Sequence, residues 1–149
     1  MIFPYRRYQI DPTPTIPSGE VYRPLVPMRV FRPKQSIQMF GLLDTGADNV
    51  FLSASLAQIL GVDLSIEADL AQGAGGHELN VRSGSIEIEI GNDNESYKWP
   101  LVASFVETDD EPVVAFLGHS GFLEYFNAGF DGLAYVAELI ALGRFPQTR

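Results

Sequence analysis

The sequence contains no cysteine, and this absence excludes a thiol nucleophile, a disulfide framework and thiolate metal sites. Histidine is scarce: His77 and His119 are the only two, which excludes a histidine-rich metal cluster. Positive charge is in deficit, since 10 Lys and Arg stand against 19 Asp and Glu, for a formal net charge of −9. Nucleic-acid binders present a basic face and anionic membranes attract cations, so neither partner is expected.

Long apolar runs are also missing. No stretch is long enough to span a bilayer, and the first residues, MIFPYRRYQI, lack the continuous apolar segment of a signal peptide. A cytoplasmic protein is therefore the expectation, and no residue pattern suggests a cofactor or a metal ion. What is present is 149 residues, 46% of them apolar, which suits one domain with its own core.

Residues 1–20 are expected to form an extended N-terminal arm, because residues 11–19 hold three prolines. From residue 21 the pattern is typical of short strands separated by turns. The clearest strand is Ser85–Ile90, in which isoleucine alternates with glutamate. Further strands are expected at Val26–Phe31, Ser36–Leu43, Val50–Leu52, Tyr97–Val106, Val113–Leu117 and Ala134–Leu142.

Helices should be few and short. Ser53 can cap a helix over Ala54–Leu60 that ends at Gly61, and Gly121–Phe126 allows one or two helical turns. The glycines of residues 73–76 indicate the tip of a hairpin. These features predict an all-β protein, a small closed barrel with one or two short helices.

One segment carries the chemistry. Residues 42–48 read LLDTGAD, so Asp44 follows two leucines, and a carboxylate at the end of a buried strand is costly unless it is paired or hydrogen-bonded. Gly46 then allows a tight turn and the close approach of another backbone. An isolated Asp-Thr-Gly is also compatible with a turn or with a cap for the following helix. The flanking pattern favours a functional site, because the leucines, the second acid and the apolar run at Val50–Leu52 occur together.

The segment Leu42–Asp48 resembles the active-site strand and loop of the retropepsins, the retroviral and retroviral-like aspartic proteases. Three further segments resemble the family in the family's order, and the match covers about residues 21–130. Tyr22–Val26 resembles the strand before the active site, and Gly73–Gly76 resembles the flap tip. Ala115–Gly118 resembles the family's second conserved block, which is two apolar residues and a glycine before the C-terminal helix. The sequence departs from the family at His119 and Ser120, where the family often has Arg and then Asp or Asn, and at His77, often apolar.

The resemblance implies a retropepsin-like acid-protease barrel over residues 21–149, with a flap at about 70–82 and a C-terminal hairpin at about 127–142. It implies an aspartic endopeptidase that cuts extended polypeptides. One Asp-Thr-Gly per chain implies a homodimer in which two Asp44 carboxylates activate a water molecule. Asp44, Thr45 and Gly46 would form the catalytic segment. The residues implied to bind peptide are Gly46, Ala47, Asp48, Gly75 and Gly76. The residues implied to support the site and the dimer are Arg23, Gly118 and His119, with His119 as a partner for Asp48.

Two other readings stay open on the sequence. The chain can be a non-catalytic retropepsin-like module that binds peptides or dimerises, because a fold does not guarantee a chemistry. It can also be an unrelated small barrel that binds a ligand, with Asp44 as a structural turn residue.

Overall fold

The computed structural model describes residues 1–72, 76, 78–107 and 114–146. Its helical elements are α1 (Ala54–Leu60) and a single 3-10 turn, η1 (Leu123–Tyr125). Its strands are β1 (Ile2–Pro4), β2 (Arg6–Gln9), β3 (Glu20–Arg23), β4 (Leu25–Arg32), β5 (Gln35–Leu43), β6 (Val50–Ser53), β7 (Asp69–Gln72), β8 (Glu78–Gly91), β9 (Ser96–Val106), β10 (Ala115–Leu117), β11 (Phe126–Asp131) and β12 (Val136–Ala141).

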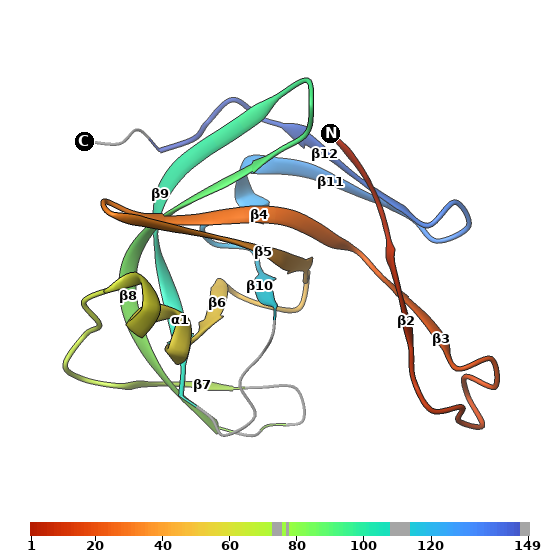
Figure 1. Ribbon diagram of the computed structural model, residues 1–149, viewed down its shortest axis with the longest axis horizontal. Helices are drawn as coiled ribbons and strands as arrows, with labels where there is room; N and C mark the ends of the chain where they lie inside the picture. Colours follow the sequence, from red (N-terminus) through yellow and green to blue (C-terminus); the bar gives the residue numbers. More distant parts are fainter. Residues whose placement is uncertain (73–75, 77, 108–113, 147–149) are drawn as a thin grey trace.

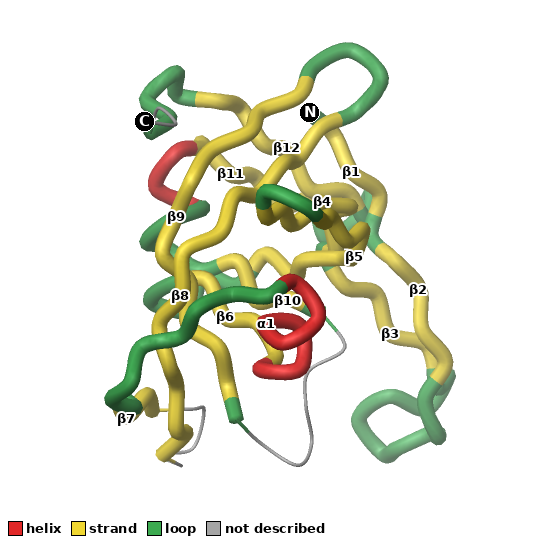
Figure 2. Tube along the Cα trace, turned by 60° about the vertical axis from the view of Figure 1, so that its left-hand side comes forward, coloured by secondary structure: helices red, strands yellow, loops and turns green. Residues whose placement is uncertain are grey.

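Among the described residues, six strands close into a barrel in the order β4-β5-β10-β6-β9-β8, because β8 returns to pair with β4. β7 continues the sheet beyond β8, and α1 lies beside the barrel wall (Figures 1 and 2). The prediction of an all-β closed barrel with short helices is confirmed. In the described part of the chain, no helix has the length and apolar character needed to cross a membrane.

The barrel interior follows the sequence periodicity. On β8, Ile86, Ile88 and Ile90 are buried, whereas Glu87 and Glu89 point outward and form ion pairs with cations on β9 and β4. This alternation is the one predicted for residues 85–90, and it sets which face of β8 turns inward.

Aromatic rings form a cluster around Trp99. Trp99 on β9 is fully buried, and its indole Nε1 donates to the carbonyl oxygen of Gly121 at 2.9 Å. The rings of Phe122 and Phe126 lie 5.7 and 5.8 Å from the ring of Trp99, between centroids. Phe145 packs on the same cluster, which ties the C-terminal segment to the barrel.

The helix ends were predicted well at α1 and less well near the C-terminus. Ser53 caps α1 through a hydrogen bond from Leu56, and Gly61 ends it in the left-handed conformation with φ of 63°. Residues 121–126 form only the 3-10 turn η1, because Phe126 is already extended and begins β11. The last strand starts two residues later than expected, since Asp131 Oδ1 accepts two backbone N–H groups of the preceding turn.

Two strand groups lie outside the barrel. β1 pairs with β12, which pairs with β11, so residues from both ends of the chain share one three-stranded sheet. β2 and β3 pair only with each other and form a hairpin over residues 6–23. From here on, the term arm refers to this hairpin and not to residues 1–20. Figure 1 shows the arm projecting away from the barrel. Residues 1–20, expected to be an extended segment, thus contribute strands to both groups.

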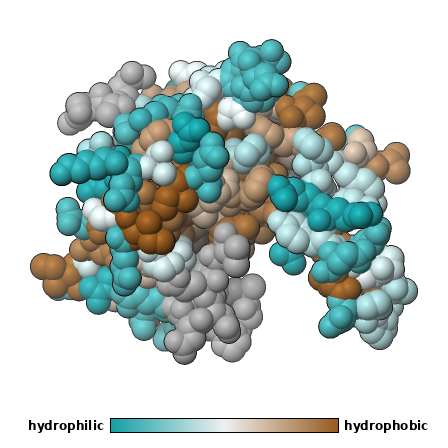
Figure 3. All heavy atoms as spheres, in the orientation of Figure 1, coloured by the Kyte–Doolittle hydropathy of each residue, from teal (hydrophilic) through white to brown (hydrophobic). Residues whose placement is uncertain are grey.

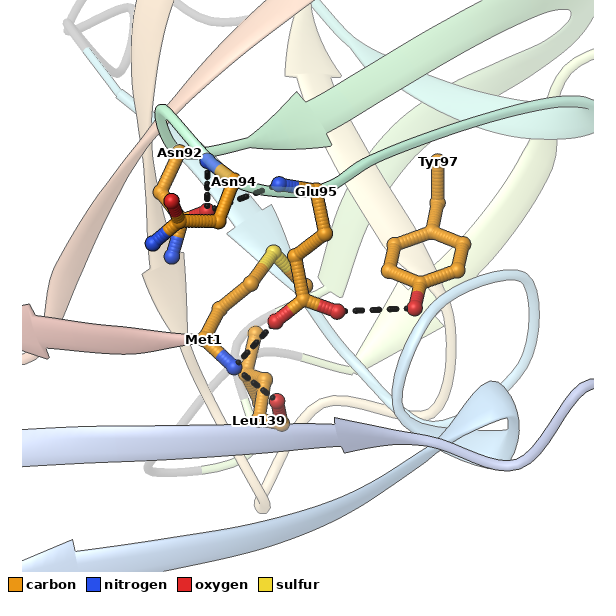
Figure 4. Close-up of polar contacts among 6 residues, drawn as sticks. All are labelled: Met1, Asn92, Asn94, Glu95, Tyr97 and Leu139. Carbon is orange, nitrogen blue, oxygen red and sulfur yellow. Dashed lines mark hydrogen bonds and ion pairs between the residues drawn. The ribbon is translucent and has the colours of Figure 1, made fainter.

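The amine of Met1 holds the three-stranded sheet against the β8–β9 turn (Figure 4). It donates to the carbonyl oxygen of Leu139 at 2.8 Å and lies 2.9 Å from Oε1 of Glu95. The other oxygen of Glu95 accepts the Tyr97 hydroxyl at 2.8 Å. The hydrogen bond from the amine, followed by that from Tyr97, lowers the pKa of Glu95 below its ordinary value of 4.5.

Replacing Glu95 by Gln is expected to lower the urea midpoint of unfolding at neutral pH but not in strong acid. A carboxyl whose pKa is lower in the folded state stabilises the protein above its unfolded value, and this contribution is lost as pH falls through the folded value. The difference from wild type should be constant between pH 4.5 and neutrality and should shrink below that range. Glu138→Gln, which changes an exposed carboxylate on β12, is the control. A difference that persists in strong acid would contradict the expectation.

Candidate active site

The segment that carries Asp44 is the loop 44–49, which joins β5 to β6. These two strands are not neighbours, because β10 lies between them, parallel to β5 and antiparallel to β6. The residues that follow β10 therefore lie next to the loop. Buried apolar residues anchor all three strands, among them Leu43, Val50 and Leu117, so the loop starts and ends on a rigid frame.

Backbone hydrogen bonds join the loop to the residues that follow β10. The Asp44 N–H donates to Leu117 at 3.2 Å, the His119 N–H to Ala47 at 2.9 Å and the Ser120 N–H to Asp48 at 2.8 Å, in each case to the carbonyl oxygen. These bonds engage the first residue of the loop and two residues near its end, so they fix where the loop starts and how it returns to β6.

Gly118 lies at the point of closest approach. A Cβ at this position would lie 2.4 Å from the carbonyl oxygen of Ala47 and 2.3 Å from that of Asn49, and both are backbone atoms. Glycine is thus required here by space, since any side chain would push the loop away from the end of β10.

Asp44 stands at the end of β5 with its carboxylate held by the turn. Its Oδ1 accepts the Gly46 N–H at 2.9 Å, and its carbonyl oxygen accepts the Ala47 N–H at 3.2 Å. The side chain is half-buried, while Thr45 and Gly46 are exposed. Asp44 opens this turn but does not cap α1, whose cap is Ser53. In the part of the chain that the structure describes, no cation forms an ion pair with Asp44 or Asp48.

The other predicted site residues are distributed around this loop. Ala47 is half-buried and Asp48 exposed. Gly76, at the tip of the hairpin of β7 and β8, is exposed with φ of 79°, a conformation that favours glycine. Gly75, together with Gly73, Ala74 and His77, lies outside the described residues. The structure therefore brings Asp44–Asp48 and Gly118 together, and it describes only one of the two predicted flap glycines.

Arg23 and His119 are both exposed. Arg23 ends β3, and its guanidinium carbon lies 5.6 Å from the centroid of the Tyr8 ring. The expected pairing of His119 with Asp48 is absent as an ion pair between the two described side chains. The two segments meet instead through the backbone, by the hydrogen bonds of His119 to Ala47 and of Ser120 to Asp48.

Asn49 and Ser104 are site residues that sequence reasoning missed. Asn49 closes the loop, and its Nδ2 donates to Oγ of Ser104 at 3.0 Å. Ser104 lies on β9 between buried residues and is itself only 6% exposed. The available signal was a serine within the apolar stretch 101–106, because a polar side chain in a buried strand needs a hydrogen-bond partner.

Removing either partner of this hydrogen bond is expected to destabilise the protein. Asn49→Ala and Ser104→Ala should each lower the free energy of unfolding by about 1–2 kcal/mol, because the first leaves the buried Ser104 and the second the half-buried Asn49 without this hydrogen bond. The double variant should cost less than the sum of the two, by urea denaturation. Asn127→Ala, on the exposed face of β11, is the control. Strictly additive effects would show that the two side chains are not coupled.

Within the described residues, no group of three or more His, Asp or Glu side chains is arranged to hold a metal ion. The chemical groups that this site offers are therefore a carboxylate at the end of β5, a second exposed carboxylate four residues later, and the backbone groups of the loop between them.

Fold and site together define a closed all-β barrel with Asp44 in the loop between β5 and β6. Backbone hydrogen bonds join this loop to the end of β10 and to the residues that follow it. No family model matches the sequence, and no curated protein matches it. Among solved structures, the chain is similar to the EIAV protease in complex with an inhibitor, at 22% identity and a TM-score of 0.40, over 65% of this chain and 82% of that one. It is also similar to a retropepsin-like aspartic protease from Rickettsia conorii, at 20% identity and a TM-score of 0.46, over 77% of this chain and 81% of that one.

Proposed function

We propose that this protein is an aspartic endopeptidase of the retropepsin type that acts as a homodimer. The observation that supports this most strongly is the setting of Asp44. Its carboxylate lies at an exposed edge of the barrel, oriented by the Gly46 N–H at 2.9 Å, and it has no cationic partner among the described side chains. A carboxylate that is oriented but not neutralised is available for proton transfer.

The proposed reaction needs two such carboxylates. One chain carries one Asp-Thr-Gly, so a two-fold dimer supplies the pair. Two carboxyl groups a few Å apart cannot both ionise easily, and they share one proton. The ionised Asp44 takes a proton from a water molecule, which attacks the scissile carbonyl. The protonated Asp44 of the second chain hydrogen-bonds that carbonyl and later gives its proton to the leaving nitrogen.

The neighbouring residues take the roles that the sequence resemblance implies. Thr45 stabilises the pair of acids across the two-fold axis. Gly46, Ala47 and Asp48 contact the main chain of an extended peptide, and Gly75 and Gly76 close over it as in β-augmentation. The residues proposed to support the site and the dimer are Arg23, Gly118 and His119. The space around Gly118 supports its proposed role, since the lack of a side chain at this position permits the contact between loop 44–49 and the end of β10.

The function is tested by incubating the protein with an unfolded protein mixture at several pH values from about 3 to 7, a range that extends to both sides of ordinary carboxylate titration. Fragments are identified by mass spectrometry, and the oligomeric state is measured at the same concentrations. We expect cleavage with a bell-shaped pH profile and a specific activity that rises with protein concentration as dimers form. A folded dimer that cuts nothing would favour the non-catalytic binding module instead.

A further inference from the structure

The two faces of the arm differ in charge. Residues that are paired across β2 and β3 share a face, and the register pairs Arg6 with Arg23 and Tyr8 with Val21. These four residues form what we call the cationic face. Arg7, Gln9, Glu20 and Tyr22 form the opposite face.

The opposite face satisfies its own charges. Nη1 of Arg7 lies 3.1 Å from Oε1 of Glu20, which also accepts the Gln9 amide at 3.4 Å. Tyr22 stacks on Tyr135 of the C-terminal hairpin, with ring centroids 4.2 Å apart. This face therefore holds the arm in place and offers few free polar groups.

The cationic face does not satisfy its charges. Like charges directly opposite each other on neighbouring strands are destabilising, and Arg6 and Arg23 are such a pair. Neither guanidinium has an ion-pair partner in the described part of the chain. Arg6 instead lies over the ring of Phe40 at 4.0 Å, and Arg23 lies 5.6 Å from the centroid of Tyr8. Cation–π contacts orient the guanidiniums and leave their N–H groups free to bind an anion.

The arm joins the barrel beside the candidate active site. Its last strand leads through Pro24 into β4, and the carbonyl oxygen of Pro24 accepts the N–H of Leu43, the residue before Asp44. The space-filling view shows the arm separated from the barrel by a hollow (Figure 3). If two Asp44 loops meet on a two-fold axis, the partner approaches this same edge of the molecule.

We propose that Arg6, on the cationic face of the arm, binds a carboxylate of a second copy of this chain, so that the arm is a clasp that holds the dimer through β2 in addition to the contact already proposed for Arg23. Charge complementarity favours this occupant, because a chain with 19 acidic and 10 basic residues presents carboxylates to any copy that it meets. A two-fold axis forms every such contact twice, which increases the effect of each arginine. The inference rests on the homodimer of the proposed function and adds to it the strand β2, through Arg6.

The test compares two neighbouring arginines on opposite faces of β2. Dimer dissociation constants of wild type, Arg6→Gln and Arg7→Gln are measured by sedimentation equilibrium at low and high salt. We expect Arg6→Gln to raise the dissociation constant by about 10-fold and to weaken its salt dependence, because a charged contact across the interface is lost. Arg7→Gln should leave the dissociation constant unchanged, because Arg7 pairs within its own chain.

Three results would overturn the inference: equal dissociation constants for the two variants, a wild type that stays monomeric, or an Arg6→Gln dimer of normal strength whose KM rises only for acidic peptides. The third result would assign the cationic face to the substrate. The cleavage assay separates this inference from the proposed function. If the dimer cleaves peptides and its dissociation constant does not depend on Arg6, only the role of the arm is contradicted. If the dimer depends on Arg6 but cleaves nothing, the role of the arm is supported and the peptidase function is contradicted.

Discussion

If the proposed function holds, replacing Asp44 by Asn is expected to reduce peptide cleavage by about 10³-fold or more, because neither chain of the proposed dimer then has a group that can take a proton from water. The fold should persist. The amide oxygen of Asn can accept the Gly46 N–H as Oδ1 of Asp44 does at 2.9 Å, and the backbone bonds of the turn do not involve the side chain. Activity against an unfolded protein and the thermal midpoint should be measured together, with Asp93→Asn, in an exposed turn, as the charge-matched control.

Mixing wild type with an excess of the Asp44→Asn chain gives a sharper result. If each site is built from two chains, mixed dimers carry one carboxylate and one amide, and the inactive variant suppresses wild-type cleavage. Loss of activity should follow the fraction of mixed dimers rather than the fraction of variant chain. An inert variant that does not inhibit would mean that each chain works alone. Equal cleavage by Asp44→Asn and wild type would assign the chemistry to another residue.

The parts of the fold that the sequence predicted are those in which a local pattern decides the structure. Isoleucine alternates with glutamate on β8, and the same alternation of buried and outward-facing side chains is found in the barrel wall. Ser53 and Gly61 mark the two ends of α1 because the backbone there needs a side-chain acceptor and a left-handed residue. In both cases the information lies within a few residues of chain.

The contacts that shape the candidate site depend instead on backbone atoms far apart in sequence. His119 and Ser120 bind the loop 44–49 through N–H groups that every residue except proline has, so their side chains gave no sign of it. The prediction that His119 pairs with Asp48 identified two segments that are in contact, the loop 44–49 and the residues after β10. The hydrogen bonds between these segments are formed by backbone atoms and not by the two side chains. Asn49 and Ser104, 55 positions apart, are paired only because β9 runs beside β6.

The second large effect is expected for Gly118→Ala. A Cβ at Gly118 would lie 2.3 Å from the carbonyl oxygen of Asn49 and 2.4 Å from that of Ala47, and neither atom can rotate away because both belong to the backbone of the loop. Overpacking in a well-packed interior costs about 1–3 kcal/mol. The upper end of that range is expected here, since relief of the clash also lengthens the backbone bonds of His119 and Ser120 to the loop. For a chain of this size the thermal midpoint should fall by about 6–12 °C.

Gly132→Ala is the matched control, because Gly132 lies in the turn of the C-terminal hairpin and a Cβ added there would have no neighbour within 4 Å. Its thermal midpoint should stay close to that of wild type. If the loop must keep its path for two Asp44 carboxylates to meet, Gly118→Ala should also lose cleavage at temperatures where the variant is still folded. A folded Gly118→Ala protein with normal activity would show that the contact between loop 44–49 and the end of β10 stabilises the barrel without positioning Asp44. Loss of activity in a folded variant would instead make the small size of residue 118 a requirement of the chemistry itself.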